Sequence, residues 1–138
     1  MIDPAFKRAI SSGEVFPPFG NYSHAIHLST TSHSVQWLVM SGQLGISKIG
    51  AIPEDFDAQA EICFNSIASL LAEVGMSFAD VVKLSAFVTR REDFPAYMRV
   101  RDRYVVGTPP ASTLIIVGGF TRPEMLLEVE ALALRSGA

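Results

Sequence analysis

The feature that most constrains the fold is the run MLLEVEALAL at residues 125–134, which alternates as a β-strand does. Successive side chains of a strand point to opposite faces of its sheet. One face carries Met125, Leu127, Val129, Ala131 and Ala133, and the other carries Leu126, Glu128, Glu130, Leu132 and Leu134. The first set suits a face covered by helices. The second set mixes leucines with two carboxylates, so we expect a face that packs against other subunits and contains a polar pocket.

Five segments rich in β-branched and apolar residues predict strands, and two segments with helical spacing of apolar residues predict helices. The strands are 22–29, 35–42, 80–89, 112–118 and 125–134, and the helices are 57–75 and 91–107. The apolar stripe of the first helix is Ala60, Cys63, Phe64, Ile67, Leu70, Leu71 and Val74, and that of the second is Phe94, Tyr97, Met98, Arg101, Tyr104 and Val105. The order β-β-α-β-α-β-β predicts an α+β fold with one sheet, of which two such helices can cover only one face.

Composition bounds the organisation of the chain and its partners. With 138 residues, 49% of them apolar and 18% charged, the chain is predicted to form one domain, residues 1–138, that buries apolar surface in a homo-oligomer. A net charge of −3 favours neither nucleic acid nor an anionic membrane as a partner. The single cysteine, Cys63, and the lack of an apolar run of roughly 20 residues predict a cytoplasmic protein without a membrane span.

The histidines do not predict a metal site. His24 and His27 are three positions apart on an expected strand, so they point to opposite faces, and His33 lies in a turn-like run. We therefore expect them to be ordinary strand and loop residues.

Glu128 and Glu130 form a candidate acid–base pair. Two positions along a strand place their Cα atoms about 7 Å apart on one face. Proximity and desolvation can separate the pKa values of such a pair, so that one carboxyl donates a proton and the other accepts one. On spacing alone, the simpler interpretation is a structural carboxylate paired with an arginine and a second one at a sheet edge.

Several motifs taken together resemble the Rid (YjgF-like) family of reactive intermediate deaminases. They are FGNYSHAI, WLVMSGQLG, FNSIASLLAEVGMSFADVVKLSAFVT, DFPAYMRVRDRYV, PPAS and LLEVEALAL, and they run in the family's order from about Phe19 to Leu134. The resemblance implies a chorismate-mutase-like (YjgF-like) α+β fold, with a single mixed sheet, two helices on one of its faces, and a homotrimer with a central barrel. It also implies clefts between subunits in which an enamine or imine is hydrolysed to a keto acid and ammonia, without metal or organic cofactor.

The resemblance carries over to individual residues. It assigns the motif tyrosine to Tyr22, the glycine of SGQ to Gly42, and the carboxylate that positions or activates water to Glu128. Two positions depart from the family pattern, because Ser112 stands where the deaminases carry an arginine that binds the substrate carboxylate, and Met98 stands where asparagine is usual. Neither serine nor threonine can replace the arginine as a cation. The pKa of Glu128 should rise without that cation, and Arg122 or Arg101 are candidates to replace it.

Two functions follow as hypotheses. The first is a Rid-like enzyme that hydrolyses an imine, an enamine or a related carbonyl compound, with Glu128 and Tyr22 as catalytic residues. Its substrate would differ from a simple imino acid, and the residues expected to contact it are Gly42, Met98, Ser112 and Thr113. The alternative is a non-catalytic trimer that binds a small metabolite as a sensor. RNA cleavage, an activity also attributed to the family, is disfavoured by the acidic charge balance.

Overall fold

The computed structural model describes residues 6–29 and 35–136, so His33 lies outside the described residues. It contains one seven-stranded sheet in the order β1-β2-β3-β7-β5-β6, with the short β4 also paired to β7. The strands are β1 (Lys7–Ile10), β2 (Ala25–Ser29), β3 (Val35–Met40), β4 (Gln43–Leu44), β5 (Val81–Val88), β6 (Ala111–Ile116) and β7 (Leu127–Ser136). All pairs are antiparallel except β5 and β6, which makes the sheet mixed.

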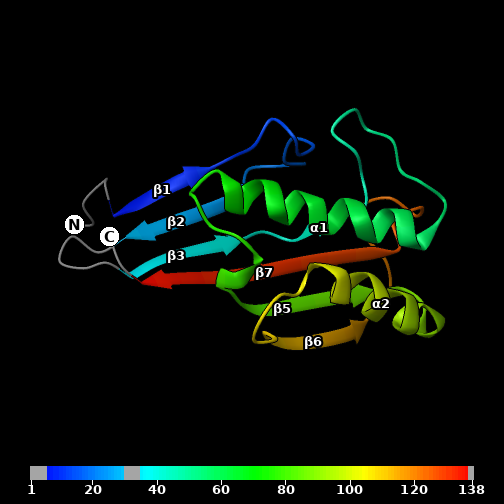
Figure 1. Ribbon diagram of the computed structural model, residues 1–138. Coiled ribbons are helices and arrows are strands. Elements are labelled where there is room, and N and C mark those ends of the chain that lie inside the picture. Colours follow the sequence, from blue (N-terminus) through cyan, green and yellow to red (C-terminus); the bar gives the residue numbers. More distant parts are fainter. Residues whose placement is uncertain (1–5, 30–34, 137–138) are drawn as a thin grey trace.

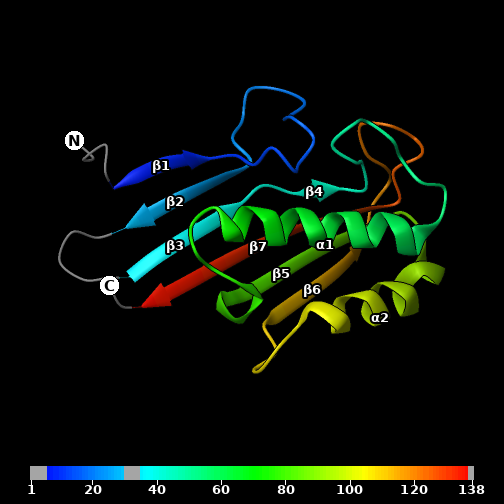
Figure 2. The same cartoon turned by 45° about the horizontal axis from the view of Figure 1, so that its top comes forward.

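Both helices lie on the same face of the sheet, α1 (Phe56–Ala72) across its middle and α2 (Phe94–Tyr104) beside β5 and β6 (Figures 1 and 2). Asp55 begins α1 by accepting a hydrogen bond from the Ala58 amide at 3.0 Å. Gly75 follows its C-terminus with φ of 72°, a conformation that favours glycine. Short 3-10 turns, Phe78–Asp80 and Arg91–Asp93, lead into β5 and α2.

The predicted α+β class, the single sheet and the placement of both helices on one face are confirmed. The predicted strands do not include β1. The segment 35–42, predicted as one strand, contains β3, which ends at Met40, and β4 follows only at Gln43. Both missed strands are short, and β1 begins with two charged residues, so neither shows a clear two-residue period. No helix in the described ranges is long and apolar enough to cross a bilayer.

The core lies between the helices and the sheet. The stripe predicted for α1 is confirmed, because its members from Ala60 to Leu71 are fully buried and Val74 packs against the same cluster. The stripe predicted for α2 is wrong at one position. Met98 is 39% exposed, whereas Val100 is fully buried. Val100 follows Tyr97 by three residues and precedes Tyr104 by four, which places it on their side of the helix.

The opposite face of the sheet carries apolar side chains that no helix covers. Trp37 and Val39 on β3 and Ile115 on β6 are 40%, 44% and 46% exposed. They flank the outward residues of β7, in which leucines alternate with Glu128 and Glu130. We call this surface the open face.

Candidate functional site

β7 presents the two carboxylates on the open face. Leu127 and Val129 are fully buried toward the helices, and Glu128 between them is half-buried on the other side. Glu130 is exposed. The alternation expected from the sequence is confirmed here, and the two carboxylates differ in their access to water.

Gly42 lies directly against the side chain of Glu128. An added Cβ on Gly42 would stand 2.6 Å from Cδ and Oε2 of Glu128 and 2.7 Å from its Cγ. Carbon atoms in ordinary contact are about 3.5–4.0 Å apart. The strand that follows, β4, pairs Leu44 with Glu128, which fixes this approach. The missing side chain at position 42 is therefore what leaves room for the carboxylate.

Burial is the main reason that the pKa of Glu128 is raised above its ordinary value, and the negative charge of Glu130 raises it further. Within residues 6–29 and 35–136, no hydrogen bond or ion pair to the Glu128 carboxylate opposes this shift. A carboxyl group with a raised pKa can both accept and return a proton closer to neutral pH than an ordinary glutamate can.

Tyr22 and Gly42 line one small hollow of about 20 Å³ at the end of the sheet where Glu128 lies. Tyr22 is in the loop between β1 and β2, and its hydroxyl oxygen accepts a hydrogen bond from the Phe19 amide at 3.0 Å. The guanidinium carbon of Arg122 stands 5.6 Å from the centroid of the Phe19 ring. Gly42 therefore lies both against the Glu128 side chain and in the hollow that Tyr22 lines, and Arg122 lies over Phe19, another residue of that hollow.

Ser112 and Thr113 do not share a pocket, because neighbouring residues of β6 face opposite sides of the sheet. Thr113 is on the open face, where its Oγ1 accepts a hydrogen bond from Lys83 Nζ at 2.8 Å. Lys83 also lines a hollow of about 280 Å³ on the open face together with Glu130 and Ser85. Ser112 pairs with the buried Leu84 and faces the helix side. Ser112 and Glu128 therefore lie on opposite faces of the protomer.

The helix side of β6 brings Ser112 next to the end of α2. Ser112 and Arg101 line a hollow of about 200 Å³. Arg101 forms an ion pair with the neighbouring Asp102 at 2.9 Å, and its guanidinium carbon is 5.9 Å from the centroid of the Tyr97 ring. The Met98 side chain has no hydrogen-bond donor to offer a substrate, and it lies on the exposed side of α2.

Sequence reasoning did not single out Lys83 or Tyr97 as site residues. The position of Lys83 could have been predicted, because the alternation of the strand 80–89 places it with Ser85 on the open face. Tyr97 was expected on the apolar stripe of α2, and its burial is confirmed. No sequence pattern indicates that its hydroxyl group lies beside β6.

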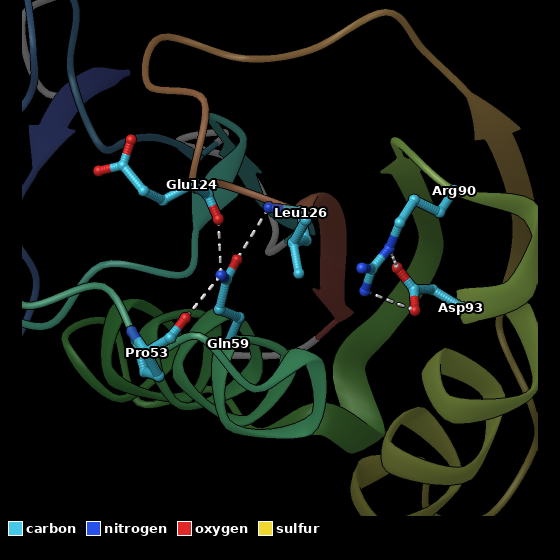
Figure 3. A network of polar contacts seen from close by, with 6 residues as sticks. All are labelled: Pro53, Gln59, Arg90, Asp93, Glu124 and Leu126. Carbon is cyan, nitrogen blue, oxygen red and sulfur yellow. Dashed lines mark hydrogen bonds and ion pairs between the residues drawn. The ribbon is translucent and has the colours of Figure 1, made fainter.

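A buried amide anchors the loop that precedes β7. Gln59 on α1 donates through Nε2 to the carbonyl groups of Pro53 and Glu124 at 2.8 and 2.9 Å, and its Oε1 accepts from the Leu126 amide at 2.9 Å (Figure 3). All three partners of the Gln59 side-chain amide are backbone groups. The network fixes the start of β7, two residues before Glu128.

A second contact in the same view holds the turn between β5 and α2. Arg90 binds Asp93 through two parallel hydrogen bonds of 2.8 and 3.0 Å (Figure 3). Within the described part of the chain, no group of three or more His, Cys, Asp or Glu side chains is arranged to hold a metal ion.

The mixed sheet with two helices on one of its faces makes this a small α+β protein of the YjgF-like fold. Its other face carries the half-buried Glu128 carboxyl, which lies against Gly42. The family model described as Endoribonuclease L-PSP matches residues 13–135. The chain belongs to this family, whose members include the Rid reactive intermediate deaminases.

Known proteins resemble the chain over most of its length. It is 29% identical to Protein DfrA of Myxococcus xanthus over 129 residues, which covers 92% of this chain and 95% of DfrA. It is 28% identical to the 2-iminobutanoate/2-iminopropanoate deaminase of Salmonella typhimurium over 102 residues, 71% of this chain and 79% of the deaminase. The crystal structure of RidA from an Antarctic Psychrobacter species superposes with a TM-score of 0.81 at 26% identity, covering 91% of this chain and 98% of RidA.

Proposed function

We propose that this protein is a hydrolase for imines or enamines that works without metal or organic cofactor. Glu128 would transfer protons, and Tyr22 and Gly42 would form the wall of the site. The contact between Gly42 and the half-buried Glu128 carboxyl carries the proposal, because it sets a carboxyl of raised pKa against a glycine that also lines the hollow of Tyr22. The relative that is named as a 2-imino acid deaminase supports the same reaction class.

The reaction balances with water as the only co-reactant. Glu128 accepts a proton from water as the water oxygen bonds to the iminium carbon, which gives a carbinolamine. The amine nitrogen then takes up that proton, and Glu128 accepts the proton of the carbinolamine hydroxyl as the carbon–nitrogen bond breaks. The products are a carbonyl compound and ammonia, which leaves as ammonium when it takes the proton from Glu128. The raised pKa of Glu128 suits both steps, because one group must accept the proton and return it.

We further propose that the working unit is a homotrimer with its sites between protomers. Two observations support a partner copy. The open face exposes Trp37, Val39 and Ile115, and a patch of this kind is typical of a surface that another protein covers. Ser112 and Glu128 lie on opposite faces of one sheet, so only residues from two copies could meet in one cleft. A cytoplasmic location remains a prediction.

A direct assay tests the activity. An amino-acid oxidase generates the imine of 2-aminobutanoate in the presence of semicarbazide, and the purified protein competes with semicarbazide for that imine. We expect the protein to reduce semicarbazone formation, and Glu128→Gln to lower this effect at least about 100-fold, since general acid–base groups contribute roughly that much. Glu130→Gln is the matched control on the same strand and should stay active.

The sensor hypothesis predicts another pattern. A metabolite would raise the melting temperature of the protein, as any ligand of the folded state does. Neither wild type nor Glu128→Gln would change semicarbazone formation with any imine supplied. Full activity in Glu128→Gln would instead remove this carboxyl from the mechanism.

A further inference from the structure

His24 is a buried polar side chain that the proposed reaction does not use. It lies directly before β2 and is only 5% exposed. Its Nε2 stands 2.8 Å from the carbonyl oxygen of Phe16. A carbonyl oxygen can only accept a hydrogen bond, so Nε2 carries a proton and donates it. In the neutral ring, Nδ1 then has no proton and is an acceptor.

Two segments of the candidate site meet at His24. Its side chain binds Phe16 in the loop between β1 and β2, and the same loop carries Tyr22. Its backbone carbonyl accepts a hydrogen bond at 2.8 Å from the amide of Ser41, the residue before Gly42. The Ser41 hydroxyl adds a bond of 2.7 Å to the carbonyl oxygen of the residue that precedes His24. His24 therefore joins the loop of Tyr22 to the segment 41–43.

Contacts within the loop extend this anchor to Tyr22. The rings of Phe16 and Phe19 pack in a tilted geometry, with their centroids 5.3 Å apart. The Phe19 amide donates to the Tyr22 hydroxyl oxygen at 3.0 Å. Tyr22 is itself 46% exposed, so the core does not hold its side chain. The position of Tyr22 therefore depends on the loop that Phe16 ties to His24.

We infer that His24 is a positioning residue that holds the loop of Tyr22 against the segment 41–43, with one water molecule bound to its Nδ1 in the adjoining hollow. The inference rests on the proposed function, because Tyr22 and Gly42 are the wall of that site. The chemistry of the reaction stays with Glu128. A histidine suits this place because one ring donates to the loop and accepts from the hollow.

The hollow suits one water molecule in size and in chemistry. Its volume is about 20 Å³, and a cavity of about 10–15 Å³ or more can hold a single water. His24 lines it, and within the described residues its enclosed Nδ1 has no hydrogen-bond partner. Gln43 and Ser66 line it as well and offer further hydrogen-bonding groups, as a buried water requires. With a donor at Nδ1 and an acceptor at Nε2, the neutral ring keeps one tautomer and one orientation.

Variants of His24 test the anchor in the semicarbazide competition assay. His24→Leu removes both nitrogens and should lower kcat/KM roughly threefold to tenfold, as for the loss of one hydrogen bond. His24→Gln places an amide N–H within reach of the Phe16 carbonyl oxygen and should recover most of that loss, whereas His24→Asn is too short to do so. His27→Leu is the matched control and should keep wild-type kcat/KM, because His27 lies on β2 and bonds to Gln36 instead, with Nε2 3.0 Å from Oε1.

A double-mutant cycle separates positioning from general stability. If His24 acts through Tyr22, His24→Leu should lower kcat/KM much less in a protein that already carries Tyr22→Ala. A purely structural role would give the same loss in both backgrounds. The melting temperature of each variant checks that it is folded.

Two measurements need no substrate. The hydrogen-bonded amides of Phe19 and Tyr22 should exchange with deuterium faster in His24→Leu than in wild type, and His24→Gln should restore their protection. Nitrogen NMR of the wild type in mildly alkaline buffer should place the His24 proton on Nε2. A long-lived water at Nδ1 should give an NOE to the ring proton that lies between the two nitrogens.

Several results would overturn the inference. A proton on Nδ1, or no water NOE at the ring, refutes the water site. Wild-type amide exchange in His24→Leu, or equal losses of kcat/KM in the two Tyr22 backgrounds, refutes the anchor. The proposed function fails separately. Imine turnover that His24→Leu leaves unchanged refutes the inference and keeps the reaction, whereas a wild type without turnover refutes the reaction and leaves amide exchange to decide whether His24 holds the loop.

Discussion

Replacing Gly42 with alanine should damage the site while leaving the fold intact. The new Cβ would stand 2.6 Å from Cδ and Oε2 of Glu128. Ordinary carbon contacts of about 3.5–4.0 Å require the carboxylate to withdraw by roughly 1 Å. A displacement of roughly 1 Å in a reacting group can cost on the order of 100-fold in rate, and we expect kcat/KM for imine hydrolysis to fall by about that factor.

Stability should change much less than activity. The atoms that the new Cβ meets belong to the end of a flexible side chain, and moving it off its rotamer costs about 0.5–1.5 kcal/mol. Gly13→Ala is the matched control, because an added Cβ there has no neighbour within 4 Å. The semicarbazide competition assay and a thermal melt are run on both variants. A folded Gly42→Ala protein with wild-type kcat/KM would show that the position of Glu128 does not govern the reaction.

Three other predictions concern the carboxylates, the buried amide and the thiol. Because the charge of Glu130 raises the pKa of Glu128, Glu130→Gln should move the acidic limb of the pH profile of kcat/KM to lower pH. An unchanged limb would show that the charge of Glu130 does not affect the pKa that governs the reaction. Gln59→Leu leaves two carbonyl groups and one amide without partners, and urea unfolding should show a free energy of unfolding lower by about 2–4 kcal/mol. The control Glu61→Gln, on the same helix, removes a solvent-accessible ion pair and should lower it by less than about 1 kcal/mol. The Cys63 thiol, whose pKa is raised by burial and then by Glu128, should react with a disulfide reagent only as fast as the protein unfolds; rapid labelling of the folded protein would contradict its burial.

The elements with a long, regular period were predictable from the sequence. The stripe of α1 repeats over about four turns, and the alternation of β7 covers ten residues, so both faces of each could be assigned. The strands β1 and β4 are four and two residues long, and their positions depend on pairing with β2 and β7. Local patterns carry no information about such partners.

The candidate site was predictable as a set of residues but not as an arrangement. The family resemblance supplied Tyr22, Gly42 and Glu128, and the structure places Gly42 against Glu128 and in the hollow that Tyr22 lines. Ser112 and Thr113 were expected to serve one pocket, although the period of a strand sends them to opposite faces. The contact of Glu128 with Gly42 joins segments far apart in the sequence, and no spacing rule indicates it.

The placement of Ser112 and Glu128 on opposite faces of the sheet has a consequence for genetics. In the proposed trimer, each cleft takes Glu128 from one chain and Ser112 from another. Two variants that block different halves of the cleft, Glu128→Gln and the bulky Ser112→Trp, should then complement each other when unfolded and reassembled together. Random assortment of equal amounts would give intact pairs at about one quarter of the interfaces, because each heterologous contact draws its two halves independently. Coexpression of both alleles in one cell should restore activity for the same reason.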